Sequence, residues 1–414
     1  MTPWKKLSPE AIRERVFGAL KENVNYYNEN IIGVPASHLD DKVFYQDAPF
    51  LKNAPYLSTL IYNPNHIGCH TLGKSESFFK GTQKIEKELI EICSKAILKG
   101  KGDFDGYVAS GGTEANMQAI WMYRNYFLQE KQADIGEIVI LSSADAHYSS
   151  PKAANILNLD IEEIPVNYKD RKMSYKDCLN VIKDQKAQGK RFFICIANMM
   201  TTMFGSVDDV GILTRALQSA AVEYKVHVDG AYGGFFHPFS SINTDLDFSN
   251  DEVSSVTLDA HKMLQAPYGT GIFLCRKGLI HYANTEKASY VEGEDYTVIG
   301  SRSGANAVAV WMILMTYGSH GWYEKVLILL NRTDWLCQQL DALNIKYFRQ
   351  SASNIVTIQS DQLSNEIAYK YGLVPDNHNS PKWYKAVIMD HVTVEKMQPL
   401  IDDIKNLVIL SNDE

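Results

Sequence analysis

The middle of the chain alternates short apolar segments with amphipathic ones, and this alternation narrows the folds open to it. Four apolar segments have the length and the β-branched and aromatic content of buried strands, at 137–142, 191–197, 224–229 and 253–258. Helical patterns at 175–188 and 210–221 lie between them, and a further strand pattern follows at 271–275. Strands that alternate with helices form a mostly parallel sheet with helices on both faces. We therefore predict an α/β fold built on a mostly parallel central sheet.

The pattern changes near residue 305 and predicts a second, smaller unit. The elements expected there are two apolar helices, two short strands and a last helix, at 305–317, 322–343, 355–358, 383–389 and 393–407. We predict a large domain over residues 61–304 and a smaller α/β domain over residues 305–414. Residues 1–60 combine a helical pattern with a loop rich in Asn, Pro and Asp, and we expect them to pack with the smaller domain.

The composition argues against several functional classes. The 414 residues carry a formal net charge of −8 and no basic cluster, which argues against nucleic acid or an anionic membrane as the main partner. The first residues lack the apolar stretch of a signal peptide, and no apolar run approaches the roughly 20 residues that span a bilayer. We therefore expect a cytoplasmic protein. Cys195 and Cys275 fall in strand patterns, so we expect them to be reduced core residues.

Two residues at the expected ends of neighbouring strands predict the chemistry. Asp229 ends the strand in Val-His-Val-Asp-Gly-Ala, at the edge where α/β sheets bind ligands, and Lys262 follows the next strand in Leu-Asp-Ala-His-Lys-Met. A lysine amine forms a Schiff base with an aldehyde, and a carboxylate keeps a pyridine nitrogen protonated so that the ring accepts electrons. The pair therefore suits pyridoxal phosphate, in an enzyme that breaks a bond at the α-carbon of an amino acid. Taken alone, Asp229 would also fit a helix cap and Lys262 a solvated loop.

A glycine-rich segment, Ser-Gly-Gly-Thr-Glu-Ala-Asn at 110–116, opens a helical pattern. Its glycines let the backbone approach an anion, Thr113 can cap the helix, and the N–H groups of a helix start favour phosphate. A capped helix after a glycine turn would have the same sequence, but the position upstream of the two strand-end residues favours phosphate binding. His147 and Thr202 also follow expected strands, so polar residues from several strand ends would meet at one rim of the sheet.

His66, Cys69 and His70 lie close enough in sequence to hold a zinc ion. Their segment contains Pro and Gly rather than a helical pattern, and no Glu lies between the histidines as metalloproteases require. We therefore predict no metal, and we expect His66 and His70 to face the substrate from a loop.

Six motifs occur in an order that resembles the group II pyridoxal-phosphate amino-acid decarboxylases. They are SGGTEAN, DAHYS, TTMFGSVDDV, HVDGAYGG, LDAHK and GSRSGA, and the similarity covers roughly residues 55–320. In length and motif style the chain is most similar to the short microbial tyrosine/aspartate decarboxylases. The resemblance implies an aspartate-aminotransferase-like fold (fold type I) and a homodimer with its active site at the subunit interface. It also implies that an L-amino acid, aromatic or acidic, loses carbon dioxide and leaves as the amine.

The resemblance further implies which residues act around the reacting centre. Lys262 matches the Schiff-base lysine, and Asp229 matches the partner of the ring nitrogen. His147 matches the histidine that stacks on the ring, and Ala231 matches the residue beneath it. Tyr290 falls where these enzymes carry a mobile-loop tyrosine that protonates the α-carbon after decarboxylation.

The remaining matches concern binding. Gly112, Thr113 and His261 match contacts to the cofactor phosphate. Thr202 matches a contact near the ring, and Arg302 matches an arginine near the cofactor and the substrate.

Two alternatives to a decarboxylase stay open. The segment Ile-Gly-Ser-Arg-Ser-Gly also resembles sphingosine-phosphate lyases, which share the fold and the cofactor but cleave a carbon–carbon bond. Those lyases usually carry an N-terminal extension or a membrane anchor, and no such pattern is seen here, which favours the decarboxylase. A catalytically silent relative is the other alternative, and the intact Lys262, Asp229 and His147 argue against it.

Overall fold

A computed structural model describes most of the chain from residue 80 onward. The described residues are 80–241, 245–284 and 294–412, together with Glu10, Asn30, Ile32, Asp40, Lys42, Val43 and the strand Asn65–Ile67. Within them, no helix is both long enough and apolar enough to cross a membrane.

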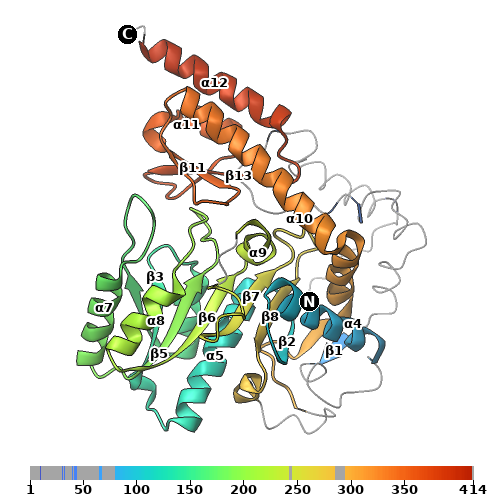
Figure 1. The fold of residues 1–414 in the computed structure, drawn as a ribbon, viewed down its shortest axis with the longest axis vertical. Coiled ribbons are helices and arrows are strands. Elements are labelled where there is room, and N and C mark those ends of the chain that lie inside the picture. The colour runs from blue at the N-terminus through green and yellow to red at the C-terminus, as the bar shows by residue number, and fades with distance from the viewer. Residues whose placement is uncertain are drawn as a thin grey trace, which may run out of the picture.

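A seven-stranded sheet forms the centre of the larger unit (Figure 1). Its strands, in spatial order, are β2 (Phe104–Ala109), β8 (Gly271–Arg276), β7 (Val253–Asp259), β6 (Glu223–Gly230), β5 (Phe192–Asn198), β3 (Ile138–Ser143) and β4 (Asp160–Ile164). Strand β8 pairs antiparallel with both of its neighbours, whereas β7, β6, β5, β3 and β4 pair parallel with one another. The predicted mostly parallel sheet is therefore confirmed.

Helices cover both faces of this sheet. Helices α5 (Gly112–Glu130) and α6 (Ser149–Leu157) pack on one face, and α7 (Tyr175–Ala187) and α8 (Val210–Ser219) pack on the other, where Figure 1 shows them side by side. Successive strand residues point to opposite faces. Along β5, Ile194 joins the core beneath α5, and Cys195 joins the core beneath α7. Cys195 and Cys275 are buried free thiols, as expected.

Two strands of this seven-stranded sheet, β2 and β4, were not predicted from the sequence patterns. Strand β4 is an edge strand with mostly polar residues, so it lacks the apolar run of a buried strand. Asp105 and Gly106 interrupt the apolar pattern of strand β2. A side chain at Gly106 would lie 2.4 Å from the carbonyl oxygen of Phe273, so the neighbouring strand β8 leaves room for glycine only.

The smaller unit stacks on one end of the larger one, and one long helix joins the two (Figure 1). Helix α10 (Gly304–Ala342) unites the two helices predicted after residue 305, with a break at Gly318, whose φ is 62° and ψ 178°. A four-stranded antiparallel sheet follows, in the order β10 (Tyr347–Phe348), β11 (Ile355–Gln359), β13 (Trp383–Val387) and β12 (Val374–Pro375). Helices α11 (Asn365–Lys370) and α12 (Val394–Asn412) complete this unit.

Helix α4 (Lys80–Glu91) precedes β2 and packs against α10. Upstream, Ile32 and Asp40 contact the smaller unit, and Asp40 also donates its N–H to the carbonyl of Gln265 in the larger unit. The backbone N–H of Ile32 donates to Tyr371 at 3.1 Å, and its carbonyl accepts from Val387 at 2.8 Å. Asp40 forms a buried ion pair with Lys325 of α10 at 3.0 Å. The packing of residues 1–60 on the smaller unit and the division at residues 60 and 304 stay predictions.

Candidate active site at the carboxyl ends of the parallel strands

A cavity of about 400 Å³ opens at the carboxyl ends of β6 and β7, beside the start of α5. Seven residues that the sequence analysis singled out line this cavity, namely Gly112, Thr113, His147, Asp229, Ala231, His261 and Lys262. Ser110, Gly111, Glu114, Asn116, Tyr148, Asp259, Tyr268 and Gly269 complete the wall. Because parallel strands deliver their carboxyl ends to one edge, residues far apart in sequence meet here.

Asp229 presents a buried carboxylate to the cavity. It lies within strand β6, one residue before its end, so the helix-cap alternative is wrong. The residue is 7 % exposed, and its Oδ1 accepts a hydrogen bond from the N–H of Ala231 at 3.0 Å. Its Oδ2 accepts one from Nδ2 of Asn116 at 2.8 Å. A carboxylate held this way offers a negative charge to a cationic group in the cavity.

Lys262 presents its amine from the turn that follows β7. The Nζ atom lies 3.2 Å from Oδ2 of Asp259, and Nε2 of His261 lies 3.6 Å from the same oxygen. Burial lowers the pKa of His261, so its imidazole is neutral near pH 7. Its Nδ1 is buried and has no hydrogen-bond partner within the described part of the chain. The turn therefore supplies a primary amine and, beside it, a buried imidazole nitrogen whose hydrogen-bonding capacity is unused within the described residues.

Within the glycine-rich segment, Gly112 lies against Asp259 and Ala231 without room for a side chain. A Cβ on Gly112 would lie 2.8 Å from Oδ2 of Asp259 and 2.9 Å from Cβ of Ala231. Helix α5 begins at Gly112 with Gly111 as its N-cap, so the suggestion that Thr113 caps the helix is wrong. Thr113 is instead the second residue of the helix, on the cavity wall. The first N–H groups of a helix lack intrahelical partners and favour an anion.

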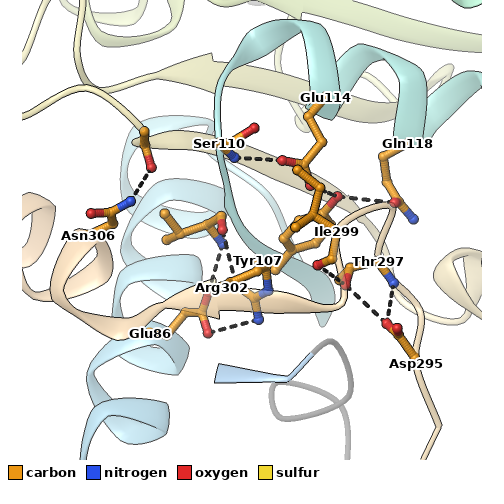
Figure 2. Close-up of polar contacts among 12 residues, drawn as sticks. Glu86, Tyr107, Ser110, Glu114, Gln118, Asp295, Thr297, Ile299, Arg302 and Asn306 are labelled. Atoms are coloured by element: carbon orange, nitrogen blue, oxygen red, sulfur yellow. Dashed lines mark hydrogen bonds and ion pairs between the residues drawn. The ribbon is translucent and has the colours of Figure 1, made fainter. Parts of the chain in front are cut away.

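Buried side chains support this segment from behind, as Figure 2 shows. The N–H of Ser110 donates to Oε2 of Glu114 at 2.7 Å. The hydroxyl of Tyr107 lies 3.0 Å from Oε1 of Glu114 and 3.0 Å from Oε1 of Gln118. Gln118 in turn accepts from the N–H of Val298 at 3.0 Å. The start of α5 is thus tied both to β2 and to the segment before β9 (Ser301–Ser303).

Arg302 lies in this supporting layer and not on the cavity wall (Figure 2). Its Nη1 forms an ion pair with Oε1 of Glu86 at 2.6 Å and donates to the carbonyl of Val108 at 3.0 Å. The guanidinium stands 4.9 Å from the centre of the Tyr107 ring. Because its side chain is only 5 % exposed, the arginine links α4, β2 and β9 in this structure. A contact between Arg302 and a substrate stays a prediction.

His147 lines the cavity from the loop after β3. Its Nδ1 accepts a hydrogen bond from the N–H of Ser149 at 3.2 Å, which leaves the proton on Nε2. Burial lowers its pKa, with Asp229 opposing and Lys262 reinforcing that effect, so the ring is neutral near pH 7. A neutral aromatic ring on the wall suits contact with a flat ligand.

Four other predicted residues lie away from the cavity or are described only in part or not at all. Thr202 follows β5 but is exposed and does not line the cavity. The backbone of His66 pairs with Arg302 in the two-stranded ladder of β1 (Asn65–Ile67) and β9, and the structure does not describe its side chain. His70 and Tyr290 lie outside the described residues, so their predicted roles are untested.

Three polar residues near the cavity were not predicted from the sequence. Asn116 and Asp259 lie within the motifs SGGTEAN and LDAHK, but neither was given a role. Lys385 comes from β13 of the smaller unit, is 4 % exposed, and donates to the carbonyl of Thr202 at 3.0 Å. Burial, together with the positive charge of Lys262, lowers its pKa to about 8. No local pattern around Lys385 signals that position, because only the packing of the two units creates it.

Comparisons with known proteins identify the family of the chain. The model of the pyridoxal-dependent decarboxylase conserved domain matches residues 84–356. A tryptophan decarboxylase from Clostridium sporogenes is 50 % identical over 404 residues, which cover 97 % of each chain. A probable L-tyrosine/L-aspartate decarboxylase from Methanothrix thermoacetophila is 27 % identical, with 86 % of this chain and 92 % of that protein covered.

Among solved structures, an L-methionine decarboxylase variant from Streptomyces sp. 590 has a TM-score of 0.79 and 18 % identity, and the match covers 98 % of this chain and 97 % of that one. This likeness confirms the predicted fold type I. The family model describes decarboxylases, and both relatives are named as decarboxylases. The predicted decarboxylation of an amino acid with pyridoxal phosphate is therefore confirmed, and it is preferred over carbon–carbon cleavage. This chain belongs to the pyridoxal-dependent decarboxylase family.

Proposed function

We propose that the cavity beside α5 binds pyridoxal 5′-phosphate and that the protein decarboxylates an aromatic L-amino acid there. Lys262 and Asp229 are the two principal residues of this proposed site. One observation carries the proposal. The amine of Lys262 and the buried carboxylate of Asp229 face one cavity, whose wall also contains the N-terminal end of helix α5. A primary amine, a carboxylate and a helix start complement an aldehyde, a pyridinium nitrogen and a phosphate.

The residues on the wall fit this cofactor. Gly112 has no space for a Cβ, so the backbone of the loop itself forms that part of the wall. The buried Nδ1 of His261 has no partner within the described residues, and it can donate to a phosphate oxygen when it carries the proton. Asp229 keeps lone pairs for one further donor beyond Asn116 and Ala231.

Each residue then has a defined task. When bound, the cofactor supplies an electron sink for the bond that breaks at the α-carbon. Lys262 would hold the cofactor through its amine and would free it for the substrate amine, and Asp259, whose Oδ2 lies 3.2 Å from Nζ, would orient the lysine. Asp229 holds a proton at the ring nitrogen. His147 offers its neutral ring to the flat face of the ligand. Tyr290 returns a proton to the α-carbon, as predicted from the sequence.

For the substrate we propose tryptophan, converted to tryptamine and carbon dioxide. The support is the 50 % identity to a tryptophan decarboxylase over nearly the whole chain. We expect His66, His70 and Arg302 to contribute to the substrate side, as the sequence predicts. The test is release of carbon dioxide and amine from a panel of L-amino acids at matched concentrations. Tryptophan should have the highest kcat/KM, and a preference for aspartate or glutamate would refute the proposed substrate while leaving the reaction unchanged.

The predicted homodimer and cytoplasmic location belong to the same proposal. A shared active site predicts that activity falls as the protein is diluted below the dimer dissociation constant. Analytical ultracentrifugation and activity measured over the same concentration range would test this, and full activity in a monomeric fraction would contradict it.

A further inference from the structure

Behind Asp229, buried polar side chains form a continuous hydrogen-bonded chain. Oδ2 of Asp229 accepts from Nδ2 of Asn116 at 2.8 Å, and Oδ1 of Asn116 lies 3.0 Å from Nε2 of His227. Nδ1 of His227 lies 2.7 Å from Oγ of Ser255, which also accepts from the hydroxyl of Tyr123. Asn116 is 1 % exposed, and the next three residues are completely buried. The chain therefore has no access to water except through the site.

The donor direction along this chain is determined by Asp229. An ionised carboxylate only accepts hydrogen bonds, so the amide nitrogen of Asn116 must face it. That nitrogen also donates to Oγ of Ser149 at 2.9 Å, which leaves Oδ1 of Asn116 as an acceptor for His227. His227 must therefore carry its proton on Nε2.

The rest of the chain follows from this tautomer. The unprotonated Nδ1 of His227 accepts from the hydroxyl of Ser255, and Ser255 accepts from Tyr123. Nε2 of His227 also lies 3.2 Å from Oγ1 of Thr257, which gives its N–H a second acceptor. Burial lowers the pKa of His227 to about 4, so the ring stays neutral and one tautomer persists at neutral pH. Every donor in the chain thus points toward Asp229, and hydrogen bonds aligned in one direction polarise one another.

We propose that Asn116 and His227 are positioning residues, which hold the carboxylate of Asp229 in the orientation that faces the ring nitrogen of the cofactor. The proposal rests on the proposed role of Asp229. It adds that the orientation of this carboxylate depends on the Nε2 tautomer of His227, two residues earlier on the same strand. A carboxylate that is 7 % exposed needs such donors, because a buried charge without them is costly.

The first test measures the tautomer directly. In the ¹⁵N-histidine NMR spectrum of the holoenzyme, the signal that disappears in His227→Gln should show a protonated Nε2 and an unprotonated Nδ1. Protonation on Nδ1 instead would overturn the proposal, because Asn116 could not then donate to Asp229 and accept from His227 together.

The second test separates positioning from packing. His227→Leu introduces an apolar side chain of comparable size and removes the donor to Asn116. His227→Gln retains an amide N–H that can reach Oδ1 of Asn116. We expect His227→Leu to weaken pyridoxal phosphate binding by about 10-fold to 100-fold, as loss of an outer hydrogen-bonding partner does at metal sites. It should also shift the visible absorbance of the bound cofactor and lower kcat more than it raises KM. His227→Gln should restore affinity and absorbance to within a few-fold of wild type.

Two further variants make the outcome decisive. Tyr123→Phe removes only the outermost donor, so its effect on cofactor affinity should be smaller than that of His227→Leu. Asp229→Asn serves as the reference for the proposed function. Unchanged affinity and absorbance in Asp229→Asn would refute the role of Asp229 itself. A strong effect of Asp229→Asn together with wild-type behaviour of His227→Leu would refute the positioning role alone. If His227→Leu does not fold, the tautomer of the wild-type protein still decides the question.

Discussion

Gly271 is the residue whose substitution by alanine should most clearly connect packing with cofactor binding. It lies on β8, where it pairs with Ala109 of β2 and Asp259 of β7. A Cβ at this position would lie 2.5 Å from both Cα and C of Gly111 and 2.7 Å from its backbone nitrogen. All three contacts are with backbone, and the strand is held on both edges. To remove this clash, the loop before α5 must shift by about 1 Å, since carbon atoms prefer separations near 3.5–4.0 Å.

Gly271→Ala should lower both the stability of the protein and its affinity for the cofactor. Overpacking of this kind lowers stability by about 1–3 kcal/mol, so the urea midpoint of the apoprotein should fall. Displacement of Gly111 also moves the N-terminal end of α5 away from the proposed phosphate position. Because misplacement by about 1 Å can cost about 10²-fold in rate, we expect a similar order of loss in pyridoxal phosphate affinity and kcat for Gly271→Ala.

A matched variant isolates the contact. At Gly136 a Cβ would meet no atom within 4 Å, so Gly136→Ala makes the same chemical change in open space. Equilibrium urea unfolding of the apoprotein and fluorescence titration with pyridoxal phosphate should be run on both variants. Gly136→Ala should resemble wild type or be slightly more stable. Equal stability and equal cofactor affinity in the two variants would show that the approach of Gly111 to β8 does not position the loop.

Three further variants test the site and its surroundings. Lys262→Ala should abolish both carbon dioxide release and the borohydride-trapped cofactor adduct, with Lys277→Ala as a surface control; an adduct at another lysine would contradict the assignment. Tyr290→Phe should slow amine formation by about 10²- to 10⁴-fold and raise aldehyde relative to amine, since the α-carbon stays unprotonated and open to oxygen; an unchanged product ratio would make Tyr290 structural. Burial raises the pKa of Asp208 to about 6, above its value when unfolded, so folded wild type loses stability as the pH rises from about 4 to 6. Asp208→Asn should therefore be more stable than wild type at pH 8, by up to about 3 kcal/mol, and the two urea midpoints should converge near pH 4.

The strands that could be predicted from the sequence are those whose burial is visible locally. Strands β3, β5, β6 and β7 are apolar runs because each is covered by helices on both faces. The edge strand β4 and the glycine-containing β2 carry no such run, since an edge position and a close backbone approach are properties of the assembled sheet. Similarly, the break in α10 occurs at Gly318, between two helical patterns that the sequence separates.

The same distinction applies to the site. The sequence by itself determined that Asp229, Lys262, His147 and the glycine-rich segment meet, because each follows a parallel strand or opens a helix, and parallel strands end at one edge. Which partners these residues have was decided only by the tertiary structure. Asn116 reaches Asp229 across 113 positions, and Arg302 pairs with Glu86 across 216. Such contacts depend on how β2, α4, α5 and β9 pack together, and this packing leaves no periodic trace in the sequence.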